Sequence, residues 1–386
     1  MQCQRAFPGD TIIVKLIHTA DVHLDAPNRS LGDRAADLRG RTWEAWERTI
    51  DAAIERAVQL FVVAGDLFDE RSPARDTIDR AFRGIERLAD AGIDVALLPG
   101  THDCWAEATL WDSPRVRALP DRVHVLGGPE PATVHLPHLD AAVHGCAHRC
   151  DISGQRPLCA MRADPDAAVN IGVAHASLDR GDVEDSALFS DAELAATEMD
   201  YLALGHWHTW QDLSAGEVTA LLPGSIEVSG FGDWETGSVA VVTVGEGRPR
   251  VERLEVGSLQ ARRVSIDAGD LAGTEDLIAA IEEHADAGLL LEVHLTGLAA
   301  PGVALDPEAA LERLGEAFFA LRLTDRSHPA LDALDEQHLE GRLTLGRFAE
   351  LARERIEHAA DEDERRVAER ALQIGVSMLR HSGDGR

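Results

Sequence analysis

Short apolar stretches that end directly in polar loops constrain the fold of this chain more than any other feature of its sequence. Residues 14–18, 60–64 and 93–98 are three such stretches, and each runs into a loop that carries Asp or His. Residues 41–60 place apolar side chains at alternating spacings of three and four, which predicts an amphipathic helix. A second helix is expected from Pro73 to about residue 91, because proline suits the first turn of a helix. This alternation predicts an α/β layered domain with a partly parallel sheet, in which sites form at the carboxyl ends of strands.

The polar loops contain residue types that take part in metal sites. In chain order they carry Asp21, His23, Asp66, Thr101, His102, Asp103, His175, His206 and His208. Further short strands are expected over residues 123–126, 141–144, 170–174, 201–204, 218–222 and 238–244. Asp21 and His23 are two residues apart, as are His206 and His208, and this spacing places both side chains on one side of an extended chain. One such pair is weak support, but the ordered set, with each member at the end of an apolar stretch, predicts a metal site.

The mixture of carboxylates and imidazoles indicates which chemistry the site performs. Two divalent cations need about eight to ten ligand positions, and Asp66 can bridge them because a carboxylate has two oxygens. Mixed Asp and His ligands suit Mn, Fe or Zn better than Ca or Mg. Two such cations clamp a phosphate and lower the pKa of a water that attacks it. His102 is the expected general acid or charge stabiliser, with Asp103 available to orient its ring.

The strand-end motifs resemble the calcineurin-like metallophosphoesterase superfamily, and most of all its DNA-repair exonuclease branch of the SbcD and YhaO type. The matching segments are Ile17-His18-Thr19-Ala20-Asp21-Val22-His23-Leu24-Asp25, Gly65-Asp66-Leu67-Phe68-Asp69, Pro99-Gly100-Thr101-His102-Asp103, His175 and Gly205-His206-Trp207-His208, within residues 13 to 255. The resemblance implies a layered β-sandwich flanked by helices, a manganese cofactor, and 3′–5′ exonuclease with endonuclease activity. It assigns the first metal to Asp21, His23, Asp66 and His208, and the second to Asp66, His175 and His206.

Two positions depart from the family pattern. Thr101 stands where the family has an asparagine that ligates the second metal. A threonine hydroxyl is shorter than an amide side chain and a poorer donor, so we expect the second metal to bind weakly here or through a water. Ala176 replaces the usual glycine after His175. These departures bear on activity and metal occupancy, not on membership of the superfamily.

The composition changes after about Gly257, which suggests three parts: a metallophosphoesterase domain over 13–256, a capping domain over 257–335 and a helical segment over 340–382. Strands at 262–267 and 289–295, with helices at 274–286 and 307–321, predict a small α/β cap. Residues 343–358 and 361–379 predict two charged amphipathic helices. These helices dock either on the body of the protein or on a partner. The resemblance implies an SbcC-like ABC-type ATPase with a coiled coil as that partner, and a dimer of nuclease subunits.

The charge of the chain bears on its substrate. Against 37 Lys and Arg stand 68 Asp and Glu, a formal net charge of −31. Nucleic-acid binders usually show a basic surface, so the chain is not expected to grip DNA by itself. Three functions stay open: a nuclease subunit that works with an ATPase, a phosphodiesterase or phosphatase for a small substrate, and a catalytically weakened interaction subunit. The cap and the C-terminal helices favour the first, the charge favours the second, and Thr101 supports the third.

The remaining expectations concern single residues and location. The five cysteines form no regular even set, so we expect free thiols, including a packing thiol at Cys104; the alternative is a zinc fragment at Cys146-x-His148-x-Cys150. Asp69 is expected to stabilise a helix N-terminus, and Trp207 to pack into the sheet. No apolar stretch approaches the roughly 20 residues of a membrane span. Residues 1–10 contain no apolar stretch of the signal-peptide type. We therefore expect a soluble cytoplasmic protein.

Overall fold

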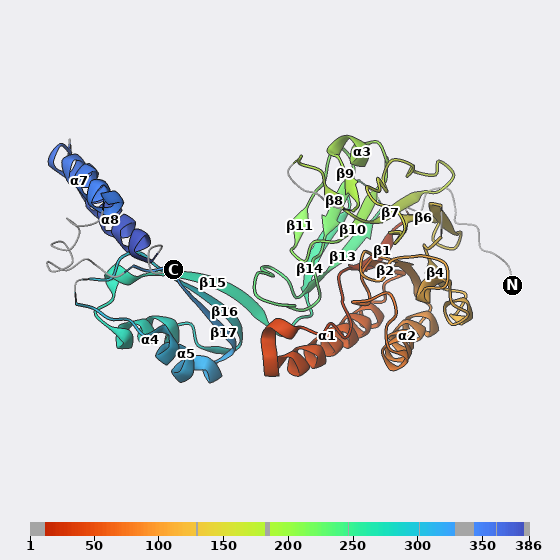
Figure 1. The fold of residues 1–386 in the computed structure, drawn as a ribbon. Coiled ribbons are helices and arrows are strands. Elements are labelled where there is room, and N and C mark those ends of the chain that lie inside the picture. Colours follow the sequence, from red (N-terminus) through yellow and green to blue (C-terminus); the bar gives the residue numbers. More distant parts are fainter. Residues whose placement is uncertain are drawn as a thin grey trace. The chain divides into compact units, whose positions relative to one another are not determined.

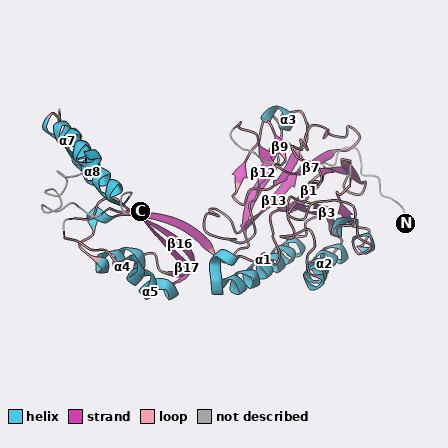
Figure 2. Cartoon of the chain, viewed as in Figure 1, coloured by secondary structure: helices cyan, strands magenta, loops and turns pink. Residues whose placement is uncertain are grey.

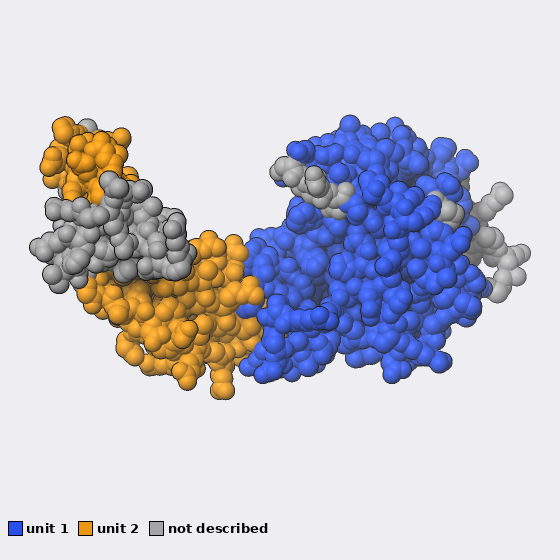
Figure 3. Space-filling view, viewed as in Figure 1, with its two compact units in different colours: residues 1–260 blue, residues 261–386 orange. Residues whose placement is uncertain are grey.

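The computed structural model describes residues 12–128, 130–181, 186–245, 247–300, 302–328, 343–359 and 361–381. The chain divides into two compact units, residues 1–260 and 261–386 (Figure 3). Both C-terminal helices belong to the second unit. Its further division into a cap and a helical docking segment stays a prediction.

Two six-stranded sheets form the centre of the first unit (Figures 1 and 2). The first sheet has the order β14 (Arg250–Glu255), β13 (Ser238–Val244), β1 (Val14–Thr19), β2 (Leu60–Ala64), β3 (Asp94–Leu98) and β4 (Val123–Val125). The second has the order β11 (Gln211–Asp212), β12 (Thr219–Leu222), β10 (Tyr201–Gly205), β7 (Val169–His175), β6 (Ala141–Cys146) and β5 (Ala132–Leu136). Strands β1 to β4 are parallel, as are β6, β7, β10 and β12. Antiparallel pairing joins β13 and β14 to the first sheet, and β5 and β11 to the second. The predicted layered β-sandwich with partly parallel sheets is confirmed.

The sheets are held together by an apolar core between their inner faces. Leu16 and Val62 of the first sheet belong to the same buried cluster as Val143 and Val173 of the second. All residues of β2 are buried, because one face packs on the second sheet and the other on helices, and this explains its unbroken apolar sequence.

His18 links the two sheets through a buried polar contact. Its Nε2–H donates to the Leu204 carbonyl oxygen at 3.1 Å, and the Tyr201 hydroxyl donates to its Nδ1 at 2.8 Å. Burial lowers the pKa of His18 to about 3, so the ring is neutral and both nitrogens are satisfied.

Helices α1 (Ala35–Glu55) and α2 (Arg75–Asp90) cover the outer face of the first sheet (Figure 1). Trp46 and Ile50 of α1 pack with Phe82 and Ile85 of α2 and with Phe61 of β2. Helix α1 thus begins and ends about five residues before the helix predicted over 41–60. It begins earlier because Leu38 already contributes to the buried face.

Shorter elements complete the first unit. They are α3 (Asp191–Ala195), the paired strands β8 (Ser177–Leu178) and β9 (Leu188–Phe189), and the 3-10 turns η1 (Arg29–Arg34), η2 (Leu110–Asp112) and η3 (Val116–Ala118). Helix α3 begins with a capping box, in which Ser190 and Glu193 satisfy each other's backbone N–H groups.

In its described residues the second unit contains a three-stranded sheet and two pairs of helices. In chain order its elements are β15 (Gln260–Asp267), η4 (Ala268–Asp270), α4 (Thr274–Glu282), β16 (Asp286–Thr296), α5 (Pro307–Leu314), η5 (Gly315–Ala317), β17 (Phe318–Asp325), α7 (Leu343–Glu357) and α8 (Glu362–His381). The helix predicted over 307–321 is wrong beyond Leu314. Phe318 and Phe319 are buried in β17, which pairs parallel with β16, so tertiary burial decides the conformation there.

Helices α7 and α8 pack against each other through Phe348, Ala349 and Leu372. Arg370 donates to Asp267 at the end of β15 over 2.9 Å. Leu351 and Val367 remain exposed on these helices, at 49% and 69%. None of the helices in the described part of the chain is long and apolar enough to cross a membrane.

Candidate metal centre

The loops at the carboxyl ends of five strands meet at one edge of the first unit. They bring together Asp21 and His23 after β1, Asp66 after β2, Thr101 and His102 after β3, His175 at the end of β7, and His206 and His208 after β10. Asp21, His23 and His208 form one group whose ligand atoms all lie within 4.8 Å of one another, and Asp21, Asp66 and His175 form another. A third group of the same kind contains His23, Asp66 and His102.

Ring nitrogens and carboxylate oxygens converge at short distances. Nε2 of His208 lies 3.2 Å from Nε2 of His23, and Nδ1 of His206 lies 3.2 Å from Nε2 of His175. Nε2 of His175 is also 3.2 Å from Oδ2 of Asp66, which is 3.7 Å from Nε2 of His23. Asp66 thus stands between both histidine pairs, where a bridging carboxylate would be needed.

The backbone of these loops is held in a conformation that L-residues rarely adopt. Asp21, His23 and Asp66 have φ values of 50°, 48° and 52°, and His206 has a φ of 120°. The N–H of Asp21 donates to Gly65 O at 3.1 Å, and that of His23 donates to Asp66 O at 3.0 Å. Residues in such regions cost about 1–3 kcal/mol each and cluster at functional sites. The fold therefore sustains local strain here to direct these side chains inward.

Two glycines are required by the close approach of the loops. A Cβ on Gly65, whose φ is 95°, would lie 2.1 Å from Nδ1 of His175. A Cβ on Gly100 would lie 2.1 Å from Oδ1 of Asp66. Each glycine of the motifs Gly-Asp and Pro-Gly thus makes room for a side chain of the site.

Partners outside the cluster orient the imidazoles. Nδ1–H of His175 donates to Ala64 O at 2.9 Å, and His23 Nδ1 lies 3.1 Å from Asp69 Oδ1. His208 Nδ1 lies 3.4 Å from Asp233 Oδ2. With Nδ1 used in this way, Nε2 of each ring faces the cluster as a lone-pair donor, which is the arrangement found around metal-ligating histidines.

The role expected for Asp69 is wrong. Helix α2 begins only at Arg75, after Ala74 as N-cap, and Asp69 instead contacts His23 and His102. The signal was present in the sequence, because Asp69 ends the Gly-Asp-x-Phe-Asp motif. Asp233 carried no comparable signal.

The two buried carboxylates accept backbone hydrogen bonds. Asp21 accepts from the N–H of His206 with both oxygens, at 3.1 and 3.0 Å. Oδ1 of Asp66 accepts from the N–H of His102 at 2.8 Å, and the Thr101 hydroxyl donates to Oδ2 at 3.1 Å. Thr101 thus lies beside the ligand cluster and contacts Asp66 through its hydroxyl.

Charge pairing within the cluster shifts the pKa of its members. Burial raises the pKa of Asp66, but His175 and His23 outweigh it and the net shift is downward. Burial lowers the pKa of His175, but Asp66 and Asp21 outweigh it and raise the pKa to about 10. The carboxylates therefore stabilise positive charge at this point. A divalent cation can supply that charge, since histidine ligates a metal only after losing its proton.

His102 lies half-exposed at the rim of the cluster. Its ring is 4.7 Å from that of His23, centroid to centroid, and its Nδ1 lies 3.0 Å from the Asp69 carbonyl oxygen and 3.4 Å from Asp69 Oδ1. The hydrogen bond to Asp69 raises the pKa of His102 to about 9. His102 is therefore a protonated, accessible group at neutral pH.

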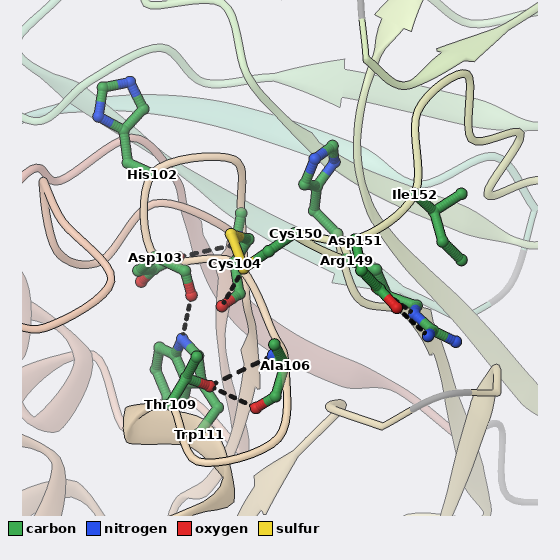
Figure 4. The surroundings of a disulfide bond; sticks show 12 residues. His102, Asp103, Cys104, Ala106, Thr109, Trp111, Arg149, Cys150, Asp151 and Ile152 are labelled. Carbon is green, nitrogen blue, oxygen red and sulfur yellow. Dashed lines mark hydrogen bonds and ion pairs between the residues drawn. A yellow bond between two sulfur atoms is a disulfide. The ribbon is translucent and has the colours of Figure 1, made fainter.

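Asp103 has a different position from the one expected. Its carboxylate is buried and accepts from the N–H groups of Gly100 at 2.8 Å and Phe68 at 3.2 Å, and Trp111 donates to its carbonyl oxygen (Figure 4). Burial, together with the charge of Asp66, raises the pKa of Asp103 to about 7. Asp103 thus fixes the backbone of the loop, while Asp69 lies against the His102 ring.

A disulfide joins Cys104, directly after this loop, to Cys150 (Figure 4). The expectation of free thiols at these two positions is wrong, and with Cys150 bonded to Cys104 the zinc fragment is excluded as well. The N–H of Trp105 donates to His148 O at 2.8 Å and that of Cys150 to Trp105 O at 3.2 Å, so a backbone ladder brings the two cysteines together. Cys146 and Cys159 are free, and Cys3 lies outside the described residues.

Trp207 also departs from expectation. It does not pack into the sheet: its side chain is 46% exposed, and its indole N–H donates to Oγ of Ser177 at 2.8 Å.

The donors present fit a pair of divalent cations. Imidazole nitrogens and carboxylate oxygens are the ligands that Mn, Fe and Zn accept in proteins. The two groups built on His23 and His175 share Asp21, and Asp66 lies in contact range of both.

The sequence of this chain is similar to those of known proteins. Residues 14–210 match the calcineurin-like phosphoesterase family. The chain is 28% identical over 223 residues to the uncharacterized metallophosphoesterase YhaO of Bacillus subtilis, covering 55% of this chain and 52% of that one. It is 25% identical over 198 residues to the DNA double-strand break repair protein Mre11 of Saccharolobus solfataricus, covering 51% and 50%. A solved dimetal phosphatase from Danio rerio aligns with 64% of this chain and 99% of its own, with a TM-score of 0.37 and 13% identity. The chain spans about half the length of the curated relatives it matches.

Proposed function

The chain belongs to the calcineurin-like phosphoesterase family of metal-dependent hydrolases, and from this premise we propose that it is a two-metal DNA nuclease. It hydrolyses phosphodiester bonds as a 3′–5′ exonuclease with endonuclease activity, in DNA repair. The observation that carries this proposal is the convergence of strained strand-end loops on one cluster of carboxylates and imidazoles, with the half-exposed His102 at its rim.

The ligands divide between two cations. In our proposal Asp21, His23, Asp66 and His208 hold the first, and Asp66, His175 and His206 hold the second, with Thr101 beside it. When bound, two manganese ions, or iron or zinc on the same donors, neutralise the phosphate and acidify an attacking water. The outer contacts of His23, His175 and His208 keep their Nε2 atoms directed inward and so preorganise the site.

His102 supplies the proton for the leaving oxygen. Its pKa of about 9 leaves it charged at neutral pH, so it either donates a proton or stabilises negative charge on the departing alkoxide. Asp69 holds the ring at its Nδ1, and the other ring nitrogen is then available for the substrate. Asp103 positions the loop through Gly100 and Phe68.

Support for DNA as the substrate comes from the relatives. One is named a DNA double-strand break repair protein, and the family match over residues 14–210 includes the whole proposed ligand set. We propose a cytoplasmic assembly with DNA and an SbcC-like coiled-coil ATPase. The exposed Leu351 and Val367 on α7 and α8 offer apolar side chains for the ATPase. A homodimer of nuclease subunits belongs to the same proposal.

One observation favours a second candidate. The net charge of −31 gives the chain little attraction for a DNA backbone, which suits a phosphodiesterase or phosphatase for a small substrate in the same site. A third candidate, a weakened interaction subunit, follows from Thr101, whose hydroxyl donates to Asp66 where an amide oxygen would ligate a metal.

Degradation of end-labelled duplex and single-stranded DNA with Mn²⁺ tests the nuclease. We expect wild type to release labelled mononucleotides, and His102→Ala to lose roughly 10²–10⁴-fold in rate, the usual contribution of a general acid. Thr101→Asn is expected to raise the rate by completing the second ligand set. His135→Ala is the matched control, since His135 is an exposed histidine on β5 that pairs with Asp164.

The outcomes separate the candidates. Equal rates for wild type and His102→Ala would remove His102 from the mechanism. An absence of degradation by all variants, with and without an ATPase partner, would reject the nuclease. Cleavage of small phosphodiesters by the same preparations would then establish the second candidate, and its absence would establish the third.

A further inference from the structure

An exposed aromatic ring stands directly beside the ligand cluster. Trp207 lies between His206 and His208 in the sequence and is 46% exposed. Among the described residues, it is the aromatic one of the large apolar side chains that are exposed. A single exposed apolar side chain is normal on a protein surface. Trp207 is distinguished by its place between two histidines of the cluster and by the contacts that hold its indole.

The ring is held in place rather than loosely attached. Its N–H donates to Oγ of Ser177 at 2.8 Å, and Ser177 is itself only 1% exposed. Ser177 begins β8, two residues after His175 at the end of β7, so the indole is tied to the segment that directly follows a proposed ligand. The Trp207 ring meets the His206 ring edge to face, with centroids 6.4 Å apart and an angle of 89°. The exposed surface is therefore a fixed platform.

The rings of Trp207 and His102 contact different histidine pairs of the cluster. His102 contacts the His23 ring, which in turn lies 4.9 Å from that of His208. Trp207 contacts the His206 ring, which lies 5.0 Å from that of His175. A phosphate ester bound between these groups would present its leaving oxygen to His102 and the rest of its nucleotide to the indole.

We propose that Trp207 stacks on the base of the nucleotide that keeps the scissile phosphate, and so selects nucleotide substrates over simple phosphate esters. This inference rests on the proposed phosphodiesterase function and names the substrate group that its site recognises. Stacking on an aromatic side chain accepts every base, as a nuclease without sequence preference requires. It also needs no positive surface, which suits a chain with a net charge of −31.

Calorimetric binding to the manganese-loaded full chain tests the platform without any hydrolysis. The probes are deoxyadenosine 5′-monophosphate and deoxyribose 5-phosphate, which share phosphate and sugar and differ in the base. We expect wild type to bind the nucleotide about tenfold more tightly, and this ratio to fall close to one in Trp207→Ala. Trp207→Phe should keep most of the ratio. Ile152→Ala removes another exposed apolar side chain of the same unit and should keep all of it.

Ser177→Ala provides a second, milder variant that leaves the indole present but releases its N–H. We expect it to reduce the ratio by a few fold, and a Mn²⁺ titration of each variant checks that the ligand cluster is intact. A tenfold ratio that persists in Trp207→Ala overturns the inference, and so does a wild-type ratio of one.

The binding and cleavage experiments distinguish a failure of the stacking proposal from a failure of the nuclease proposal. If DNA is not degraded but the base preference exists and disappears in Trp207→Ala, the platform stands and the substrate is a small nucleotide ester. If DNA is degraded with equal efficiency by wild type and Trp207→Ala at subsaturating substrate, the nuclease stands and the platform is overturned.

Discussion

Asp69 and Asp233 accept hydrogen bonds from ring nitrogens of the site and so decide which nitrogen of each histidine faces the cluster. The contacts span 46 residues for Asp69 with His23, and 25 for Asp233 with His208. Strand-end position was enough to predict from the sequence which residues cluster, because every carboxyl end of a parallel strand lies at the same edge. These outer partners come from loops whose path follows no periodic pattern, so they became visible only in the structure.

The contact between Asp69 and His102 leads to a prediction about the pKa of His102. Asp69→Asn removes the negative charge that raises the pKa of His102, so the pKa should fall from about 9 towards its ordinary value of 6.5. The proton donor is present below its pKa and is lost above it. The activity of the variant should therefore decline from near neutral pH upward, whereas wild type holds its activity to about pH 9.

Nuclear magnetic resonance titration of the His102 ring in the metal-free protein measures this shift directly. Glu70→Gln is the control, as it changes a neighbouring exposed carboxylate. A His102 pKa that is the same in Asp69→Asn and wild type would refute the role of Asp69.

At the scale of elements, strands with both faces covered were the most predictable part of the fold. The apolar stretches at 60–64 and 238–244 coincide with β2 and β13. The outer strands β5 and β14 were missed, because one face of β5 and almost all of β14 are exposed, so that neither sequence is continuously apolar. Strand β17 was taken for the end of a helix, since a short apolar segment fits both periods.

The disulfide is an element-scale contact with a measurable effect. Cys104 and Cys150 are 46 residues apart in sequence, and closing a loop of this size stabilises a protein by about 2–4 kcal/mol through the unfolded chain. Reduction should lower the free energy of unfolding of the metal-free protein by this amount. Urea unfolding with and without a dithiol reductant measures the difference.

Two variants make the disulfide measurement specific. A Cys104→Ser, Cys150→Ser double variant should unfold at the same urea concentration with and without reductant. Cys159→Ser, which changes an exposed free thiol, should keep the wild-type sensitivity. Reductant-insensitive unfolding of the wild type would contradict the bond as a stabilising contact.

At the scale of the first unit, the proposed metal ligands come from both sheets. Asp21 and Asp66 follow strands of the first sheet, and His175 and His206 follow strands of the second. The cluster therefore exists only when the sheets have packed together, and cations that bind it bind the folded state. The strand pattern alone does not predict how one sheet packs on another. Only the family resemblance implied which loops of the two sheets would meet.

Because divalent cations would bind the folded state and not the unfolded chain, adding Mn²⁺ should stabilise the fold by mass action. At a Mn²⁺ concentration 100 times the dissociation constant, the free energy of unfolding should rise by about 2.7 kcal/mol for one site. Asp66→Asn should abolish most of this gain, because Asp66 contacts both histidine pairs. Thermal unfolding with increasing Mn²⁺ measures it, with Asp37→Asn on the exposed face of α1 as the control. A gain of equal size in Asp66→Asn would place the stabilising cation elsewhere.

Strand β1 lies between β2 and β13, and the pairing of Ile17 with Val241 joins the two ends of the first unit. During synthesis β1 is made first, while its antiparallel neighbour Ser238–Val244 is among the last strands of that unit to emerge. Throughout this interval the nascent chain displays an unpaired, apolar sheet edge of the kind that associates with other chains. A ribosome that stalls after residue 210, where the family match ends, would hold a polypeptide with every proposed metal ligand translated but its first sheet still open.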